Sequence, residues 1–374
     1  MARERDQDAC PGALQVHQAA DGALVRVRLP GGMLSAAQLE ALAHVATEFG
    51  AATLELTSRA SVQLRGVTDT APVADAIAEA GLLPSPTHER VRNIVSSPLS
   101  GRRGGIVDVR PWVAELDAAV CADPVLAGLP GRFFFGLDDG SADVSGLRAD
   151  VGAHVLDEAT AALVLSGTDT GVRMELGQVV TTLLTVARRF VDIRETSWRV
   201  TELDDPAALL EGLHIEAEPG RRWPAHARGP VGWIEQHDGL ITLGAGVPLG
   251  VLPARTAEYL AAIAAPVVIT PWRSLLVCDL SEDIADVSLR VLAPQGLVFD
   301  ENSPWLDVSA CVGSPGCERS AADVRADASD AVSSGELDGG HRHYVGCDRA
   351  CGSPSVGEVL VATGDGYRRR EPHV

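Results

Sequence analysis

Alternating hydrophobic and polar positions organise the start of the chain. Residues 21–30, DGALVRVRLP, follow the period-two pattern of a half-buried strand. Two glycines then interrupt the pattern, and Ser35 is placed to cap a helix that Gly50 ends. Period-two alternation resumes over residues 52–67, so the pattern predicts a strand, a helix and a second strand.

The same order of elements returns later in the chain. A strand, a glycine-rich break, a helix and another strand are predicted over residues 237–280. Asp21-Gly22 matches Asp238-Gly239, and Thr57–Arg59 falls near Thr270–Arg273, at an offset of about 213 to 218 residues. A chance similarity between two helices rich in Ala and Leu is the alternative, but the nearly constant offset favours an internal repeat.

The segments that follow each repeat predict two α/β modules. Residues 88–220 contain helix candidates at 111–123 and 177–193, with strand-like segments between them. Residues 300–374 form the second module, in which the Ser-, Gly- and Asp-rich segment 327–340 is expected to be a loop. The chain therefore has the predicted order A-B-A′-B′.

Composition narrows the range of partners. The 374 residues carry a net charge of −20, which would repel nucleic acids and anionic membranes. No run of about 18 apolar residues predicts a transmembrane helix, and the first residues lack the apolar stretch of a secretory signal. We therefore expect a cytoplasmic protein.

Four of the seven cysteines lie in the last 64 residues. Cys311 and Cys317 form a C-x5-C pair, and Cys347 and Cys351 form a C-x3-C pair 29 residues later. Soft thiolates among Gly, Ser and Pro favour an iron–sulfur cluster, because structural zinc sites use other spacings. Zinc, disulfides and free thiols are the alternatives. The remaining cysteines lie in or near apolar segments and are expected to be buried: Cys10, Cys121 and Cys278.

A paired cysteine motif at the end of a duplicated chain resembles the sulfite and nitrite reductase family. Residues 57–66, 91–101 and 129–140 are similar to three further segments of that family. The resemblance implies a [4Fe–4S] cluster on the four cysteines, beside a siroheme that the last cysteine, Cys351, bridges. It also implies an anion site lined by these residues: Arg59, Gln63, Arg92 and Asn93.

The resemblance covers roughly residues 10–365 and implies an α+β fold with a duplicated sulfite/nitrite reductase-like architecture. Two ferredoxin-like half-domains would then alternate with two α/β modules. The expected units are half-domain 1 at 10–75, module 1 at 85–225, half-domain 2 at 230–290 and a cluster-binding module 2 at 298–374.

Two departures distinguish this chain from the sulfite-reducing enzymes. Arg132 and Phe134 stand where those enzymes have a Lys-x-Lys pair, so one cation is absent, and GCDRAC lacks their usual Pro-Asn-Gly filling. Together with residues 9–12, 270–273 and 310–317, this pattern resembles the precorrin-3B synthase branch of the family. That resemblance implies insertion of one oxygen atom from O2 into precorrin-3A, with lactone formation, in cobalamin biosynthesis.

A tetrapyrrole with acetate and propionate groups needs cations to hold it, and Arg pairs well with carboxylates. For Arg65 and the Arg102-Arg103 pair, the alternative to a substrate contact is a side chain that is simply exposed to solvent. The arginines in the expected site segments are Arg59, Arg65, Arg90, Arg92, Arg102, Arg103, Arg132 and Arg273.

The same resemblance implies a mononuclear non-haem iron near the substrate, but the sequence shows no secure ligand set. His341 and His343 lie just before Cys347, and exposed loop histidines are the alternative for them. The other available ligands are His88, Glu89 and His154. No catalytic residue is assigned.

Three functions remain open. The first is the O2-dependent tetrapyrrole monooxygenase. The second is a siroheme-dependent sulfite or nitrite reductase, which an intense visible spectrum would reveal. The third is a non-enzymatic iron–sulfur or tetrapyrrole-binding protein. No GxGxxG motif follows a strand, so an external electron donor is expected.

Overall fold

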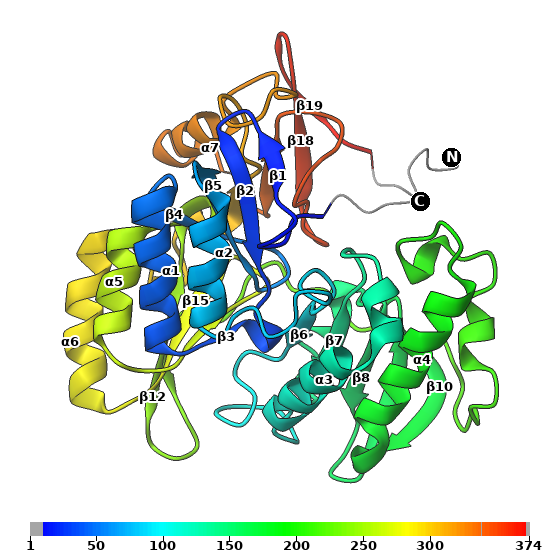
Figure 1. The fold of residues 1–374 in the computed structure, drawn as a ribbon. Coiled ribbons are helices and arrows are strands. Elements are labelled where there is room, and N and C mark those ends of the chain that lie inside the picture. Colours follow the sequence, from blue (N-terminus) through cyan, green and yellow to red (C-terminus); the bar gives the residue numbers. More distant parts are fainter. Residues whose placement is uncertain (1–9, 338, 372–374) are drawn as a thin grey trace.

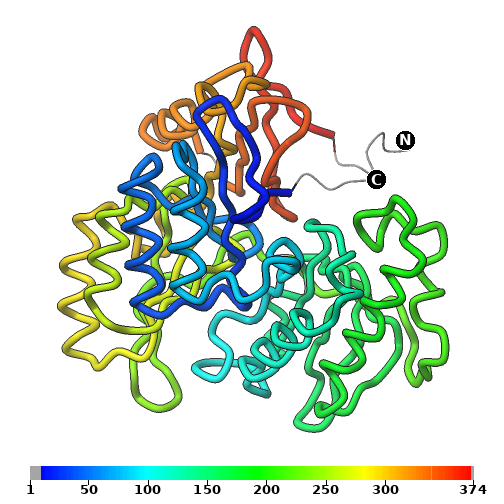
Figure 2. The backbone as a smooth tube through the Cα atoms, in the orientation of Figure 1, coloured from blue at the N-terminus to red at the C-terminus, as the bar shows by residue number. Residues whose placement is uncertain are grey.

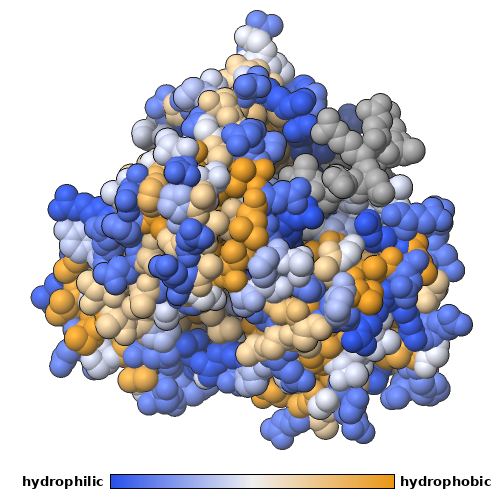
Figure 3. All heavy atoms as spheres, in the orientation of Figure 1, coloured by the Kyte–Doolittle hydropathy of each residue, from blue (hydrophilic) through white to orange (hydrophobic). Residues whose placement is uncertain are grey.

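The computed structural model describes residues 10–337 and 339–371. Figure 1 shows three lobes. The two half-domains, covered by helices, form one lobe together. The second lobe is a module that contains α3 and α4, and the third is a module that contains α7 and the C-terminal strands. Hydrophilic residues cover most of the face drawn in Figure 3, while hydrophobic residues fill separate cores inside. Within the described part of the chain, no helix combines the length and the apolar character needed to cross a membrane.

The two half-domains contain the same elements in the same order. The first consists of β1 (His17–Ala19), β2 (Gly22–Val27), β3 (Met33–Leu34), α1 (Ala36–Phe49), β4 (Thr53–Leu56), β5 (Val62–Val67) and α2 (Thr70–Glu79). The second consists of β11 (Gly232–Glu235), β12 (Ile241–Gly246), β13 (Val251–Pro253), α5 (Ala254–Ala262), β14 (Val267–Ile269), β15 (Ser274–Leu280) and α6 (Glu282–Leu292). The structure therefore contains the repeat that the sequence predicts. The capping of α1 by Ser35 and its end at Gly50 are also as predicted.

Each half-domain completes the sheet of the other. The strand orders are β1-β2-β5-β4-β13 and β11-β12-β15-β14-β3, so β13 and β3 are exchanged. Leu252 on β13 pairs with Leu54, and Leu34 on β3 pairs with Val267. One continuous hydrophobic core joins both sheets, and the half-domains therefore form a single interlocked unit.

A matched pair of turns shows how closely the halves correspond. The backbone N–H of Thr57 donates to Ser61 at 2.9 Å, and that of Thr270 donates to Ser274 at the same distance. This register makes Trp272 the counterpart of Arg59. It also makes Arg273 the counterpart of Ala60, and both of these residues have a positive φ.

Module 1 is a mixed five-stranded sheet with the order β10-β9-β8-β7-β6. The neighbours β6, β7 and β8 run parallel to one another, whereas β9 pairs antiparallel with both β8 and β10. The helices α3 and α4 bury apolar residues in the core of this module. Both helices fall where the sequence predicts them. The elements are β6 (Ile94–Ser96), α3 (Arg110–Ala122), β7 (Phe135–Asp138), β8 (Val151–Val155), β9 (Thr160–Leu165), β10 (Thr168–Glu175) and α4 (Val179–Ile193).

Module 2 repeats the parallel–parallel–antiparallel arrangement on a smaller scale. Its elements are β16 (Val308–Ala310), α7 (Val324–Ser333), β17 (Arg342–Val345), β18 (Glu358–Thr363) and β19 (Gly366–Arg369). The predicted loop at 327–340 is wrong over its first half, because α7 continues to Ser333. Asp323 caps this helix by accepting from the N–H of Ala326, and Val324, Ala328 and Ala331 form its buried stripe.

The predicted fold class is confirmed as a duplicated α+β architecture with alternating half-domains and modules. The exact unit boundaries remain predictions, and Asp338 and residues 372–374 of the last unit, with Ala9 of the segment 9–12, lie outside the described residues. The β1–β2 hairpin of half-domain 1 lies beside module 2 (Figure 2), although the two segments are distant in the sequence. This arrangement brings the start of the sequence to the cysteines.

Candidate functional site

The first cysteine of each pair lies at the same edge of the module 2 sheet. Cys311 directly follows β16, and Cys347 comes shortly after the neighbouring parallel strand β17. The N–H of Gly346 donates to the Cys311 sulfur at 3.3 Å, and the N–H of Cys311 donates to Tyr344 at 2.9 Å. The sheet topology thus joins two cysteines that are distant in sequence.

The second cysteine of each pair is held by the adjoining loops. Ala321 donates to Gly346 at 2.9 Å, which fixes the loop that carries Cys317 against the segment before Cys347. A β-carbon on Gly346 would lie 1.8 Å from the Ser320 hydroxyl, so only glycine allows this approach. Partial desolvation and the nearby thiols of Cys311, Cys347 and Cys317 raise the pKa of Cys351.

The cysteines of the described chain are all free thiols, so none of the four is used in a disulfide. Over the described ranges 10–337 and 339–371, no three His, Cys, Asp or Glu side chains are gathered tightly enough for one metal ion. A [4Fe–4S] cluster and a structural zinc ion therefore both remain proposals for the four cysteines, and the spacing of the cysteines favours the cluster, which holds its thiolates around a wider body.

Of the three other cysteines, only Cys278 is buried as expected. It lies on β15, while Cys10 and Cys121 are partly exposed.

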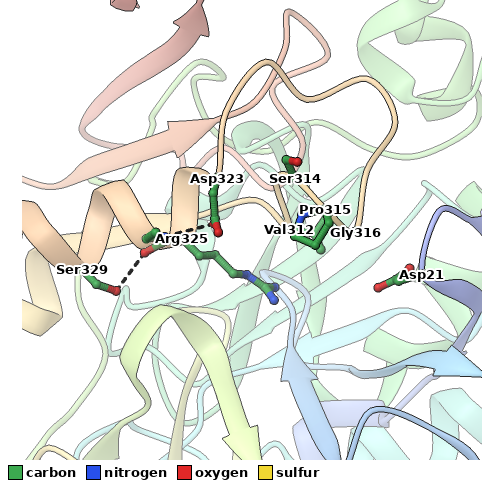
Figure 4. A pocket seen from close by; sticks show the side chains of 9 residues that line it. Asp21, Val312, Ser314, Pro315, Gly316, Asp323, Arg325 and Ser329 are labelled. Carbon is green, nitrogen blue, oxygen red and sulfur yellow. Dashed lines mark hydrogen bonds between the residues drawn. The ribbon is translucent and has the colours of Figure 1, made fainter.

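A cavity of about 420 Å³ lies beside the cysteine loop (Figure 4). It is lined by residues of that loop together with Asp21, Asp323 and Arg325. Arg325 already forms an ion pair with Glu55 at 2.5 Å. Two carboxylates and a paired cation make this hollow unsuitable for a ligand with many carboxylates.

Arg28, immediately after β2, has buried hydrogen-bond donors without acceptors. Its side chain is 2% exposed, and Nη1 donates to the carbonyl of Pro11 at 3.0 Å. Within the described residues, its Nε and Nη2 atoms have no hydrogen-bond partner. Burial and the charges of Arg26 and Arg59 lower its pKa. A buried cation with unused donors is costly unless an anion binds there, which makes Arg28 a candidate for binding an anion.

Two guanidinium groups flank the ring of Phe134. Arg59 lies 5.2 Å and Arg199 lies 5.1 Å from the ring centroid. Arg59 also donates to the carbonyl of Gly131 at 3.1 Å. Burial and the charge of Arg199 lower the pKa of Arg59 to about 10. Phe134, where the resemblance to the sulfite-reducing enzymes would place a lysine, therefore lies between two guanidinium groups from other segments.

Asp150 holds Arg199 in this place. It is fully buried, pairs with Arg199 at 2.7 Å and accepts the N–H of Phe134 at 3.0 Å. Burial raises the pKa of Asp150 despite its pairing with Arg199. We call the three residues Arg28, Arg59 and Arg199 the arginine cluster. Sequence reasoning identified Arg59 and missed the other two.

The half-domain 2 side of the site is formed by Trp272 and Arg273. Trp272 packs against the small hydrophobic group that contains Phe134, and its indole N–H donates to His226 at 2.8 Å. Arg273 donates to the carbonyl of Gly352, next to Cys351. Burial and the charge of Arg325 lower the pKa of Arg273 to about 10. These two residues connect the region of Phe134 with the cysteines.

Several predicted arginines are engaged within the protein. Arg65 pairs with Asp21 at 2.8 Å, and Arg92 pairs with Asp117 at 2.7 Å. Arg102 pairs with Asp279 at 2.7 Å, and Arg103 donates to the carbonyl of Glu235 at 3.1 Å. Arg90 is half-buried, and Arg132 is exposed with its guanidinium 5.2 Å from the ring centroid of Trp198. Among the predicted arginines, the structure thus brings Arg59 and Arg273 to the site.

The two predicted amides support neighbouring groups. Gln63 accepts from Arg26 at 2.9 Å and donates to Glu55 at 2.6 Å. Asn93 donates to the carbonyls of Gly131 and Phe133 at 3.1 and 3.0 Å, which fixes the segment before Phe134. Both amides have their donors or acceptors in use.

The candidates for a second iron are also engaged. His88 contacts Ser85 at 2.8 Å and the carbonyl of Asp123 at 2.9 Å. Glu89 accepts three backbone N–H groups of residues 13–15, and His154 contacts Ser145 at 2.9 Å. The interpretation of His341 and His343 as exposed loop histidines is wrong, because they are 9% and 0% exposed and His343 lies on β17.

Comparison with known proteins agrees with this architecture. Residues 17–80 match the family model of the nitrite/sulfite reductase ferredoxin-like half domain. The solved structure of the NirA protein of Mycobacterium tuberculosis superposes with a TM-score of 0.75 at 20% identity, covering 94% of this chain and 77% of that one. The chain therefore has the fold of the sulfite/nitrite reductase superfamily.

The sequence relatives narrow this class. A precorrin-3B synthase from Sinorhizobium sp is 27% identical over an alignment of 380 positions, which covers 96% of this chain and 81% of that protein. A ferredoxin–nitrite reductase from Synechococcus elongatus is 30% identical over 126 residues, which is 25% of its length. Along almost its whole length, the chain resembles precorrin-3B synthase, as the sequence motifs predicted.

Proposed function

We propose that this protein binds precorrin-3A and catalyses its O2-dependent hydroxylation with lactone formation, as a precorrin-3B synthase. The observation that carries the proposal is the arginine cluster, in which Arg28 keeps two buried donors without partners. A polycarboxylate tetrapyrrole would supply the missing acceptors. The similarity to a precorrin-3B synthase over 96% of the chain supports the same substrate.

The residues of the cluster have distinct roles in this proposal. Arg28 and Arg59 bind carboxylates of the substrate. Asp150 pairs with Arg199 and orients its guanidinium toward these carboxylates as well. Phe134 presents an apolar ring between Arg59 and Arg199 in place of an ammonium group. A ring can pack against a flat organic substrate but cannot donate a proton to sulfite. Phe134 therefore favours the tetrapyrrole reaction over sulfite reduction.

The cysteine loops complete the site. Cys311, Cys317, Cys347 and Cys351 would hold a [4Fe–4S] cluster, which supplies single electrons when it is bound. Arg273 ties the turn after Cys351 to half-domain 2, and its neighbour Trp272 packs against the hydrophobic group that contains Phe134. We assign no ligands to a mononuclear iron. The electrons would come from an external donor.

A siroheme-dependent sulfite or nitrite reductase is the second candidate. The half-domain match at residues 17–80 and the fold shared with NirA favour it. An absorption spectrum of the anaerobically purified protein separates the two. Intense Soret and red bands would support siroheme, whereas a broad shoulder near about 400 nm would fit an iron–sulfur cluster alone.

Turnover tests the main proposal directly. Purified protein is incubated with precorrin-3A, a reductant and 18O2, and the products are analysed by mass spectrometry. We expect a product that contains one labelled oxygen atom, and no product without O2. Binding of precorrin-3A without turnover, in protein that contains the cluster, would instead support the non-enzymatic alternative.

A further inference from the structure

A buried chain of hydrogen bonds leads to the backbone of Cys351. Nε2 of His343 lies 3.0 Å from the carbonyl oxygen of Cys351. The hydroxyl of Ser309 lies 2.8 Å from Nδ1 of His343 and 2.8 Å from Nε2 of His341. Ser309 is 4% exposed, so this chain is shielded from water.

The direction of each hydrogen bond follows from the carbonyl at its end. A carbonyl oxygen only accepts, so Nε2 of His343 must carry the hydrogen. In a neutral imidazole, Nδ1 of His343 then accepts from the Ser309 hydroxyl. The oxygen of Ser309 in turn accepts from Nε2 of His341. This single arrangement fixes the tautomer of both imidazoles, and the Ser309 hydroxyl links them.

A second donor holds the next peptide of the same turn. Arg273 of half-domain 2 donates to the carbonyl of Gly352. Gly352 has a φ of 76°, and a β-carbon there would lie 2.6 Å from Nη2 of Arg273. Two consecutive carbonyls are therefore bound, one by module 2 and one by half-domain 2. Cys351 lies in a turn, outside any helix or strand, and these two contacts add to the turn's own hydrogen bonds from Ala350 to Cys347 and from Ser353 to Ala350.

We propose that His343, set by Ser309 and His341, acts with Arg273 to position Cys351 as a cluster ligand. This inference rests on the cluster assignment of the proposed function. All four are positioning residues, since none of them uses its side chain on the cluster itself. Groups that orient metal ligands typically contribute about 10- to 100-fold to metal affinity.

Ser309→Ala is the most informative variant, because it removes only the central hydroxyl. Nδ1 of His343 would then lose its hydrogen-bond partner, so that the Cys351 carbonyl alone would orient the ring. His343→Leu removes both bonds, whereas His343→Gln retains an N–H donor for the Cys351 carbonyl. Arg273→Met removes the second contact. Ser333→Ala is the matched control, because that hydroxyl bonds to Ser329 on the exposed side of α7 in the same module.

The experiment measures cluster retention in reconstituted full-length protein. Iron and sulfide per chain, the rate of iron release to a chelator without O2, and the EPR spectrum of the reduced protein are recorded. Melting of each cluster-free variant reports its fold. We expect Ser309→Ala, His343→Leu and Arg273→Met to release iron about 10-fold faster than the wild type. Their EPR signals should be broadened, His343→Gln should lie nearer to the wild type than His343→Leu, and Ser333→Ala should be unchanged.

Two negative results have different meanings. If the wild type takes up no iron and sulfide, the cluster assignment fails and this inference fails with it. If the wild type holds a cluster but Ser309→Ala, His343→Leu and Arg273→Met release iron as the wild type does, only the positioning role is refuted. Equal acceleration by Ser333→Ala would also refute it, because the effect would then be general. Should His343→Leu fail to fold, the comparison of Ser309→Ala with Ser333→Ala decides.

Discussion

Arg65 donates a hydrogen bond of 2.8 Å to the carbonyl oxygen of Gly316, the residue before Cys317. The same guanidinium is held by Asp21 through two hydrogen bonds of 2.8 and 2.9 Å. An arginine of half-domain 1 thereby fixes the loop of the first cysteine pair. This contact supports a role for Arg65 in holding the loop that carries Cys317.

Replacing Arg65 by Met should weaken cluster retention without a direct loss of substrate contacts. The loop around Cys317 would lose its link to half-domain 1, and Asp21 would lose its partner. We expect iron release to a chelator to be about 10-fold faster, as for other groups that orient metal ligands. Arg103→Met is the control. Arg103 also donates to a backbone carbonyl, that of Glu235, but it belongs to module 1, whereas the cysteines belong to module 2. Equal retention in both variants would argue against this role.

Arg28→Met should change stability and affinity in opposite directions. The substitution removes two buried donors that have no partner among the described residues, so the ligand-free protein should gain about 1–3 kcal/mol in free energy of unfolding. Loss of a charged hydrogen bond should weaken precorrin-3A binding by about 10- to 100-fold. Chemical denaturation and a binding titration measure the two effects.

Arg92→Met provides the matched comparison. Arg92 is as buried as Arg28 but forms two hydrogen bonds of 2.7 Å to Asp117. Removal of one partner of such a pair leaves a carboxylate without its cation, so stability should fall by about 2–3 kcal/mol. Binding by the folded fraction should change little. If Arg28→Met destabilised the protein as Arg92→Met does, the proposed anion site at Arg28 would lose its support.

Local signals in the sequence predicted the elements that depend on short-range interactions. Ser35 and Gly50 delimit a helix through capping, and the cysteine spacing indicates a cluster motif regardless of the remaining fold. The helix α7 was missed because its Asp and Ser residues suggest a loop, while its stability depends on the buried face of Val324 and Ala328. Composition alone does not show which face of a short helix packs.

Features that depend on tertiary contacts were not predictable. Arg26 and Arg28 lie on the same face of β2 and of the residues that extend it. Charged residues on a strand normally face water, and only the fold shows that Arg28 is buried. Arg199 reaches Phe134 from a distant segment because Asp150 holds it there. The exchange of β3 and β13 also has no local signal, since each strand is only two or three residues long.

Cys317→Ser and Cys351→Ser should each reduce the iron and sulfide content after reconstitution to a small fraction of the wild-type value. A hydroxyl is a poor replacement for a thiolate in a cubane, so the remaining three sulfurs would not retain it. Cys121→Ser is the control, because Cys121 lies on α3 in module 1. Iron and sulfide assays with EPR provide the measurement. Unchanged content in the first two variants would remove these residues from the cluster.

Asp143 should make the stability of the protein decrease between acidic and neutral pH. Burial, together with the charge of Asp138, raises its pKa to about 7, although it accepts a hydrogen bond of 2.6 Å from Ser97. Below about pH 4 the carboxyl is protonated in both the folded and the unfolded chain and has no effect. Between about pH 4 and 7 the unfolded chain loses the proton while the folded chain keeps it, so the free energy of unfolding falls. Above about pH 7 this contribution is constant.

Asp143→Asn should remove this pH dependence. The upper bound is about 4 kcal/mol, from three pKa units at about 1.4 kcal/mol each. We therefore expect the variant to match the wild type near pH 4 and to be more stable at pH 8, in urea titrations across this range. The amide oxygen of Asn can still accept from Ser97, so packing should be preserved. Parallel pH profiles for the two proteins would show that Asp143 titrates normally in the fold, and a loss of stability at pH 4 would mean that the substitution itself disturbs the module.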